Sequence, residues 1–217
     1  MILAGLLLAA KTAGIDHIIL GVPNLDEGMR AFETRTGVKP LRGGRHPLRG
    51  TENALVSLGG GVYLEIIAPQ PEAKANEMVT ALRALKRPTL VGWAVHVPEE
   101  KDAAAKLASA GFKVSAPMPG SRVTPEGKTL EWVTFVVEKP RGDAVPFFIR
   151  WGAATAHPSL TSPGGCTMTS FAIADPAGDE LSKLLGALGV KAGVKRAKAP
   201  RMRLELRCGK RAVSFDN

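Results

Sequence analysis

The part of the chain richest in groups that could do chemistry is the loop GGRHPLRGTEN, residues 43–53. It holds Arg45, His46, Arg49 and Asn53 close together in sequence, and its glycines let the backbone approach a ligand closely. Guanidinium and imidazole groups donate charge-assisted hydrogen bonds to a carboxylate or phosphate. Arg45, His46 and Asn53 are therefore candidates for substrate binding. A surface loop whose charges are solvated would have the same composition, and both interpretations stay open.

Two further polar residues, His17 and Glu65, each stand in an otherwise apolar segment, DHIIL and VYLEIIAP. A single histidine in such a segment is most often a core residue with a satisfied hydrogen bond. An imidazole and a carboxylate on the same side of a sheet can instead exchange protons with a substrate or bind a divalent cation. The choice depends on whether the fold brings the two segments together.

Three similar segments must position these residues. They begin at Ile15, Val91 and Thr169, about 76 and 78 residues apart. Each runs from an apolar strand through a proline and a helical pattern to a glycine. Proline near the start of a helix and glycine just past its end follow the usual asymmetry of helix termini, and Asn24 with Glu27 predicts a capping box. A period of this length indicates a repeated structural module.

Alternating apolar residues, separated by glycine-containing turns, predict a hairpin after each helix. The repeated unit is therefore a βαβββ module, and the chain is expected to be an α+β protein. We expect these divisions along the chain: an apolar arm at 1–14, module 1 at 15–70, a helical linker at 71–90, module 2 at 91–152, a linker loop at 153–168 and a shorter module 3 at 169–217.

Paired βαβββ modules are also the building unit of the vicinal-oxygen-chelate superfamily. The segments DHIILGVPNLDEG, GGRHPLRGTENALVSLGGGVYLEIIAP and PFFIRWG resemble those of a bacterial glyoxalase-like family within it. The resemblance covers nearly all of the chain after Gly14. It implies curved mixed sheets around an open cup, and a small molecule bound in that cup. Superfamily members isomerise, cleave, epimerise or oxygenate small molecules, commonly at a divalent metal, and some only bind ligands.

The resemblance also implies a metal site with a ligand from the first strand and another from the last strand of each module. In module 1 those positions are His17 and Glu65, a suitable pair for a hard or borderline divalent ion. Alignment of the copies places Gly92 at the position of His17 and, approximately, Arg150 at that of Glu65. A guanidinium cannot bind a cation. A complete four-ligand site is therefore not expected.

Three interpretations of His17 and Glu65 remain open. With His46 they could form a two-histidine, one-carboxylate site for Zn, Fe, Mn, Ni or Mg, in a metal-dependent lyase, isomerase or dioxygenase. They could be a metal-free acid–base pair, with Arg150 projecting into the cup to hold a small organic anion. They could also be a hydrogen-bonded pair in a non-catalytic protein that binds a small molecule.

The net charge of +9 is concentrated near the C-terminus. Between Lys191 and Arg211 there are nine lysines and arginines but one acidic residue, Glu205. A basic segment can bind phosphate groups with salt-sensitive affinity. This one has no interleaved aromatic residues, and its apolar residues alternate as they do in a strand. A solvated strand face is expected, and nucleic-acid binding is the minor alternative.

Other features bear on partners and location. No run approaches the roughly 18 apolar residues of a membrane span, so no membrane partner is expected. The apolar N-terminus lacks the basic region of an export signal. Cys166 and Cys208 have no metal-binding spacing and are too few for a disulfide framework, so we expect buried free thiols and a cytoplasmic location. The expected partners are a small molecule and a second copy of the chain, bound through an unpaired sheet edge.

Overall fold

The computed structural model describes residues 12–124, 127–139, 142 and 144–217. Most of the apolar arm expected at residues 1–14 lies outside the described residues. The first two modules have the expected element order. Module 1 comprises β1 (Gly14–Gly21), α1 (Leu25–Thr36), β2 (Leu41–His46), β3 (Thr51–Ser57) and β4 (Tyr63–Pro69). A linker helix, α2 (Glu77–Ala84), leads to β5 (Thr89–His96), α3 (Glu100–Ser109), β6 (Met118–Val123), β7 (Thr129–Phe135) and β8 (Phe147–Trp151).

These strands form one eight-stranded mixed sheet in the order β2-β3-β4-β1-β5-β8-β7-β6. Both modules place their last strand beside their first, and the modules meet where β1 pairs antiparallel with β5. Local signals act as the sequence predicts: the Asn24 side chain accepts a hydrogen bond from the Glu27 amide (3.1 Å), and Gly37 ends α1 at a φ of 77°. The α+β class with tandem βαβββ modules is confirmed.

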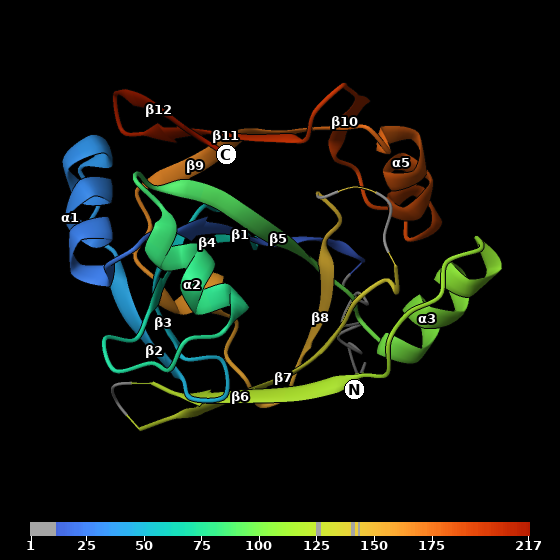
Figure 1. Ribbon diagram of the computed structural model, residues 1–217, viewed down its shortest axis with the longest axis horizontal. Helices are drawn as coiled ribbons and strands as arrows, with labels where there is room; N and C mark the ends of the chain where they lie inside the picture. The colour runs from blue at the N-terminus through green and yellow to red at the C-terminus, as the bar shows by residue number, and fades with distance from the viewer. Residues whose placement is uncertain (1–11, 125–126, 140–141, 143) are drawn as a thin grey trace, which may run out of the picture.

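The eight-stranded sheet curls until its two edge strands, β2 and β6, approach each other (Figure 1). The buried Arg122 on β6 donates a hydrogen bond to the Gly43 carbonyl on β2. Across the same seam the ring of His46 contacts that of Trp132, with centroids 6.3 Å apart. The sheet is thus nearly closed into a barrel. We call its inner face the cup.

The C-terminal part contains the short helix α4 (Pro158–Thr161), followed by β9 (Cys166–Asp175), α5 (Gly178–Ala187), β10 (Gly193–Arg196), β11 (Arg201–Cys208) and β12 (Arg211–Asp216). Its element order is again βαβββ, but its four-stranded sheet has the order β10-β9-β11-β12. Here the second strand pairs parallel with the first, and the third takes the place that the last strand has in modules 1 and 2. The third module therefore repeats the element order but not the strand order of the other two.

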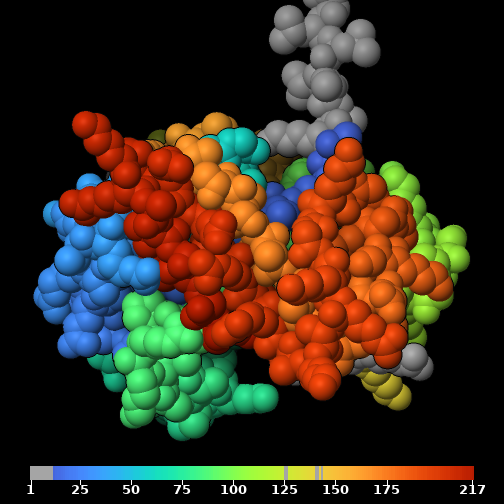
Figure 2. All heavy atoms as spheres, turned by 90° about the horizontal axis from the view of Figure 1, so that it is seen from above, coloured from blue at the N-terminus to red at the C-terminus, as the bar shows by residue number. Residues whose placement is uncertain are grey.

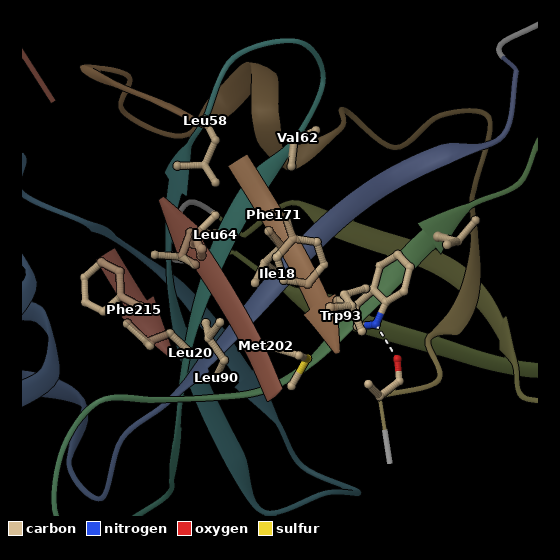
Figure 3. Close-up of a cluster of buried hydrophobic side chains, with 14 of the residues drawn as sticks. Ile18, Leu20, Leu58, Val62, Leu64, Leu90, Trp93, Phe171, Met202 and Phe215 are labelled. Atoms are coloured by element: carbon tan, nitrogen blue, oxygen red, sulfur yellow. Dashed lines mark hydrogen bonds between the residues drawn. The ribbon is translucent and has the colours of Figure 1, made fainter. Parts of the chain in front are cut away.

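The third module packs against the outer face of the eight-stranded sheet (Figures 1 and 3). Phe171 on β9 meets Trp93 on β5 edge to face, with ring centroids 5.5 Å apart, and Phe215 on β12 stacks on Phe32 of α1 at 5.7 Å. Trp93 is fully buried, and its indole N–H donates to the Ala144 carbonyl. The main hydrophobic core lies between the two sheets, so the cup is free to hold polar residues.

Cys166 and Cys208 form a disulfide that joins β9 to β11. The expectation of two free thiols is therefore wrong. The two residues are 42 apart in sequence, but they lie directly opposite each other in the antiparallel register of these strands. Strand pairing brings the thiols together, and only the register of the folded sheet defines that pairing.

Candidate functional site

The parallel pairing of β1 with β4 brings the first two candidate residues together. In the register, His17 lies beside Tyr63 and Ile19 lies beside Glu65. Side chains alternate between the two faces of a strand. Ile18 and its neighbours in β4 therefore point into the core between the sheets, while His17 and Glu65 point into the cup.

His17 and Glu65 face each other at the floor of the cup. The His17 Nε2 and Glu65 Oε2 atoms are 3.7 Å apart, and both side chains are at least nine-tenths buried. The Asn53 amide nitrogen donates to Glu65 Oε1 at 2.6 Å. Gly43 makes this bond possible, because a Cβ at that position would collide with the Asn53 side chain. One carboxylate oxygen is thus held by Asn53 while the other remains directed at the imidazole.

Asp16, the residue before His17, organises the other side of the imidazole. A register shift in the β1–β5 pairing falls at Asp16, and such a bulge can turn a side chain toward the face that its neighbour occupies. Asp16 Oδ1 is 2.6 Å from His17 Nδ1. Asp16 Oδ2 accepts from the Trp151 indole N–H at 3.0 Å and lies 3.0 Å from His157 Nε2. A fully buried carboxylate therefore contacts two imidazoles and an indole.

These contacts determine which groups are charged. Burial raises the pKa of Asp16, but the hydrogen bonds with His157 and His17 outweigh it and hold the pKa well below its usual range. Burial likewise raises the pKa of Glu65, while the nearby His17 and His46 lower it further than burial raises it. Both carboxyl groups are therefore ionised at neutral pH. Because Asp16 binds Nδ1 of His17, the Nε2 atom is left to face Glu65 and a substrate.

Aromatic rings line the cup around this pair. His17 stacks on Tyr63 with ring centroids 4.6 Å apart, and it meets Phe147 edge to face at 5.4 Å. Trp132 and Trp151 meet edge to face, with ring centroids 5.6 Å apart. The wall therefore combines apolar surface with a few convergent polar groups, as small-molecule sites commonly do.

The structure corrects the alignment of the second module. Glu65 on β4 stands beside Ile19, two residues after His17. On the corresponding strands of module 2, Phe147 stands beside Ala94, two residues after Gly92. Phe147, rather than Arg150, therefore occupies the position of Glu65. The half of the cup contributed by module 2 has no ligand residue at either expected position.

Arg150 and Arg45 are not part of the cup. Because Phe147 and Trp151 face the cup, strand alternation directs Arg150 to the opposite face of β8, where it forms an ion pair with Glu100 at the start of α3. The expectation that Arg150 projects into the cup is corrected accordingly. Arg45 is largely exposed and bonds Glu72 at 2.6 Å, so the structure does not bring it to the site either.

His46 lies beside the pair without converging on it. Its Nδ1 atom is 3.0 Å from the Thr51 hydroxyl, and its Nε2 atom is 3.5 Å from the Asn53 amide nitrogen. That amide separates His46 from Glu65. Burial lowers the pKa of His46, so the ring is neutral at neutral pH.

The residues present do not fit a complete metal site. Two donors to zinc, each with a bond of about 2.1 Å at a tetrahedral angle, would be about 3.4 Å apart, and His17 Nε2 and Glu65 Oε2 at 3.7 Å are close to that spacing. The N–H groups of Asn53 occupy the approach of the third candidate, His46. Among the described residues, no group of three or more His, Cys, Asp or Glu side chains is arranged to hold a metal ion.

Three residues of the site are not among the candidates from the sequence. Asp16 could have been found, because it is the residue directly before His17. His157 lies in the segment expected to be a linker loop, but it is the N-cap of α4, and this position brings it to Asp16. Arg122 is buried, and its charge lowers the pKa of both Glu65 and His46. Nothing in its sequence neighbourhood marks Arg122, because only the closure of β6 onto β2 brings it there.

Comparison with known proteins identifies the family and the fold. A family model described as a glyoxalase-like domain matches residues 15–189, and the chain belongs to that family. No curated protein matches the chain. A hypothetical protein from Staphylococcus aureus is 16% identical over 94% of this chain and 85% of its own, with a TM-score of 0.63, which shows the shared fold.

Smaller structures match part of the chain. Methylmalonyl-CoA epimerase from Mycobacterium tuberculosis is 17% identical over 68% of this chain and 91% of its own, with a TM-score of 0.46. A hypothetical protein from Bacillus halodurans is 15% identical over 67% of this chain and 99% of its own, with a TM-score of 0.49. Neither likeness is strong enough to transfer an activity.

Proposed function

We propose that the protein is an enzyme that moves a proton on a small anionic organic molecule bound in the cup, with His17 and Glu65 as its acid–base pair. One observation carries this: His17 Nε2 and Glu65 Oε2 face each other at 3.7 Å on the cup floor. That spacing is longer than a hydrogen bond, so the two atoms are not bonded to each other and both can turn to a substrate. Both atoms can reach one substrate atom or two adjacent ones.

The surrounding residues support such chemistry. Ionised Asp16 holds Nδ1 of His17 and stabilises the ring when Nε2 takes up a proton. Asn53 fixes Glu65 by its other oxygen. Groups that are held in place before the substrate arrives lower the cost of orienting them during the reaction.

An anionic substrate is favoured by Arg122 rather than by Arg150. The Arg122 guanidinium is almost fully buried, and its positive charge reaches the site, since it lowers the pKa of both Glu65 and His46. A buried positive charge attracts an anion more strongly than an exposed one, because water screens it less. The aromatic wall of Trp132, Trp151 and Phe147 would contact the apolar part of the same molecule.

A weakly held divalent ion bound by His17 and Glu65 is the second candidate. It is favoured by the spacing of the two donor atoms and by the hydrogen bond between Asp16 and His17 Nδ1, an arrangement common behind metal-bound histidines. Such an ion would polarise a substrate oxygen. With His46 held away by Asn53, the site would bind the ion weakly.

The disulfide supports an oxidising compartment rather than the cytoplasm that the sequence led us to expect. Disulfides persist mainly where the thiol pool is oxidised, and Cys166 and Cys208 are both buried in the third module. No helix within the described ranges is long and apolar enough to cross a membrane.

The test is hydrogen–deuterium exchange of substrate carbon-bound protons. The native protein, treated with EDTA, would be incubated in D2O with a panel of small 2-oxo and branched carboxylates and followed by proton NMR. We expect exchange at the carbon next to a carbonyl, reduced at least 100-fold in His17→Gln and in Glu65→Gln. Glu52→Gln, on the adjacent strand β3, is the control, because that side chain pairs with arginines outside the cup.

Three other results would argue against this proposal. Equal exchange by the native protein and both variants would exclude the acid–base roles. Exchange that requires added Zn, Mn, Ni, Fe or Mg would favour the metal candidate instead. Binding of a carboxylate without exchange would identify a binding protein of the same fold.

A further inference from the structure

The outward face of the C-terminal sheet carries a regular array of cations. Along β11, Met202, Leu204 and Leu206 are buried against the core, and the residues between them point outward. On β10, Lys195 stands beside Ala174 of β9, and Arg201 stands beside the same alanine from the other side. The outward array, which we call the basic face, consists of Lys195, Arg201, Arg203 and Arg207.

The basic face extends in two directions. Arg201 and Arg207 are six residues apart on one strand, about 20 Å at 3.4 Å per residue, and Lys195 lies two strand spacings to the side, about 10 Å. Ala172 and Ala212 are small outward neighbours on the flanking strands, and Asp216 of β12, which stands beside Arg203, pairs with Arg87. The long basic side chains are exposed. Figure 2 shows this sheet spread across one side of the molecule.

Most of the net charge of the protein comes from the segment that contains this face. All nine lysines and arginines between Lys191 and Arg211 are exposed, and Glu205 is the one acidic residue among them. Glu205 pairs with Arg203 at 2.9 Å. The segment thus carries a net +8, from nine basic residues less one acidic, of the +9 on the whole chain. A charge separated this strongly orients the molecule toward an anionic surface.

The composition of the face selects the kind of anionic partner. Among the described residues of the third module, no aromatic and no large apolar side chain is exposed. Stacking on nucleic-acid bases and insertion into the hydrocarbon of a bilayer both need such side chains. What remains is contact with charge alone, spread over two dimensions rather than along a line.

We propose that the basic face binds the surface of an anionic phospholipid bilayer, peripherally and reversibly. Phosphate-bearing headgroups form a two-dimensional array of negative charge that Lys195, Arg201 and Arg207 can meet at once, whereas a nucleic-acid strand offers its phosphates in a row. The disulfide beneath the face favours an oxidising compartment, where lipid surfaces are present and nucleic acid ordinarily is not. This departs from the expectation of no membrane partner.

Binding in this way would place the lipid and the cup on opposite sides of the hydrophobic core. The C-terminal sheet, whose outward side chains form the basic face, lies over the hydrophobic core and the eight-stranded sheet (Figures 1 and 3). The face of the eight-stranded sheet away from that core is the cup. The C-terminal sheet and the core would therefore separate the lipid from the cup.

The test is co-sedimentation of the full-length protein with vesicles at physiological salt. We expect binding to vesicles of phosphatidylcholine with about 30% phosphatidylglycerol, release at 0.5 M NaCl, and no binding to phosphatidylcholine alone. Each cation near an anionic surface raises the partition coefficient roughly fivefold. Replacing two of them, in Arg201→Gln with Arg207→Gln, should therefore lower the partition coefficient onto anionic vesicles about 30-fold. Lys101→Gln with Lys106→Gln, two exposed cations on α3, is the matched control.

All four substituted side chains are exposed, so both variants should have the same melting temperature as the native protein. Equal sedimentation with neutral and anionic vesicles, no sedimentation with either, or an equal loss in the control variant would each overturn the proposal. Duplex DNA that removes the protein from anionic vesicles at matched charge concentration would show that nucleic acid is the better partner.

Discussion

Asp16 shows how one buried charge can define a site. Its carboxylate is fully buried and contacts His17, His157 and the Trp151 indole, each at 3.0 Å or less. An unpaired carboxylate would be costly to bury, and these three partners compensate for its lost hydration. They come from β1, the end of β8 and the N-cap of α4, so Asp16 also ties the segment before β9 to the cup.

Replacing Asp16 should therefore change stability in a pH-dependent way. The folded-state pKa of Asp16 lies below its unfolded value, so its contribution is fully present above pH 5 and is lost as pH falls through the acid range. We expect Asp16→Asn to lose about 2 kcal/mol at pH 7, typical of hydrogen bonds to a charged group, and progressively less below pH 4. Calorimetric melting between pH 7 and 3 measures this, with the exposed Asp102→Asn as control; identical profiles for native protein and Asp16→Asn would contradict it.

The two arginines of module 2 should behave oppositely. Arg122 is buried beside the site, and Arg150 is paired with Glu100 on the opposite face. We expect Arg122→Gln to weaken binding of a small carboxylate at least tenfold, because the buried positive charge is lost. Arg150→Gln should leave the affinity within about twofold, and it should cost less than about 1 kcal/mol of stability, since it removes a partly exposed ion pair.

Isothermal titration with one carboxylate and both variants measures these affinities. A larger loss of affinity in Arg150→Gln than in Arg122→Gln would contradict the placement of the two side chains.

At the scale of elements, the pairing of strands determines which side chains come into contact. In the parallel β1–β4 pair, Glu65 stands beside Ile19, which is two residues after His17. Contact between β2 and β6 brings Arg122 to the same site. In the third module, the antiparallel β9–β11 pair aligns Cys166 with Cys208. The C-terminal sheet, whose edge strand β10 has four residues, is thereby cross-linked near the end opposite β10.

Removing the disulfide should weaken the C-terminal sheet. The cross-link closes a segment of 42 residues, which by chain entropy stabilises the folded state by about 4 kcal/mol. We expect Cys166→Ser with Cys208→Ser to lower the urea midpoint to that of the native protein in dithiothreitol, and the double variant to be insensitive to dithiothreitol. A native protein whose midpoint is unchanged by reductant would contradict this.

At the scale of the molecule, the third module covers the barrel instead of extending it. Its sheet buries the outer face of β1, β4 and β5 through a shared core. The core shared by the two sheets therefore separates the cup on one side from the basic face on the other. The two modules that pair across β1–β5 form the site, and the third supports it from behind.

Phe171 tests this arrangement, because it joins the two sheets through its contact with Trp93. We expect Phe171→Ala to cost about 3–4 kcal/mol of unfolding free energy through the cavity that it leaves. Because the third module and the barrel share one core, both should unfold in a single transition, followed by tryptophan fluorescence and circular dichroism. Two separate transitions in the native protein would show that the sheets are not energetically coupled.

Local sequence patterns predict much of this architecture. Strand alternation, the capping residue Asn24 and the glycine after each helix determine βαβββ modules without reference to distant contacts. The same alternation marks His17 and Glu65 as polar residues on buried strands. These features are short-range, so they can be recognised in sequence, and the structure bears out the elements that they predict.

Long-range contacts were decided by the tertiary structure alone. A shift of strand register moves a side chain to the opposite face, which is why Arg150 was aligned with Glu65 although Phe147 holds that position. Closure of β6 onto β2 brought Arg122 to the site, and α4 brought His157 to Asp16. Such pairings depend on how the sheets curl and pack, because residues far apart in sequence carry no local sign of meeting.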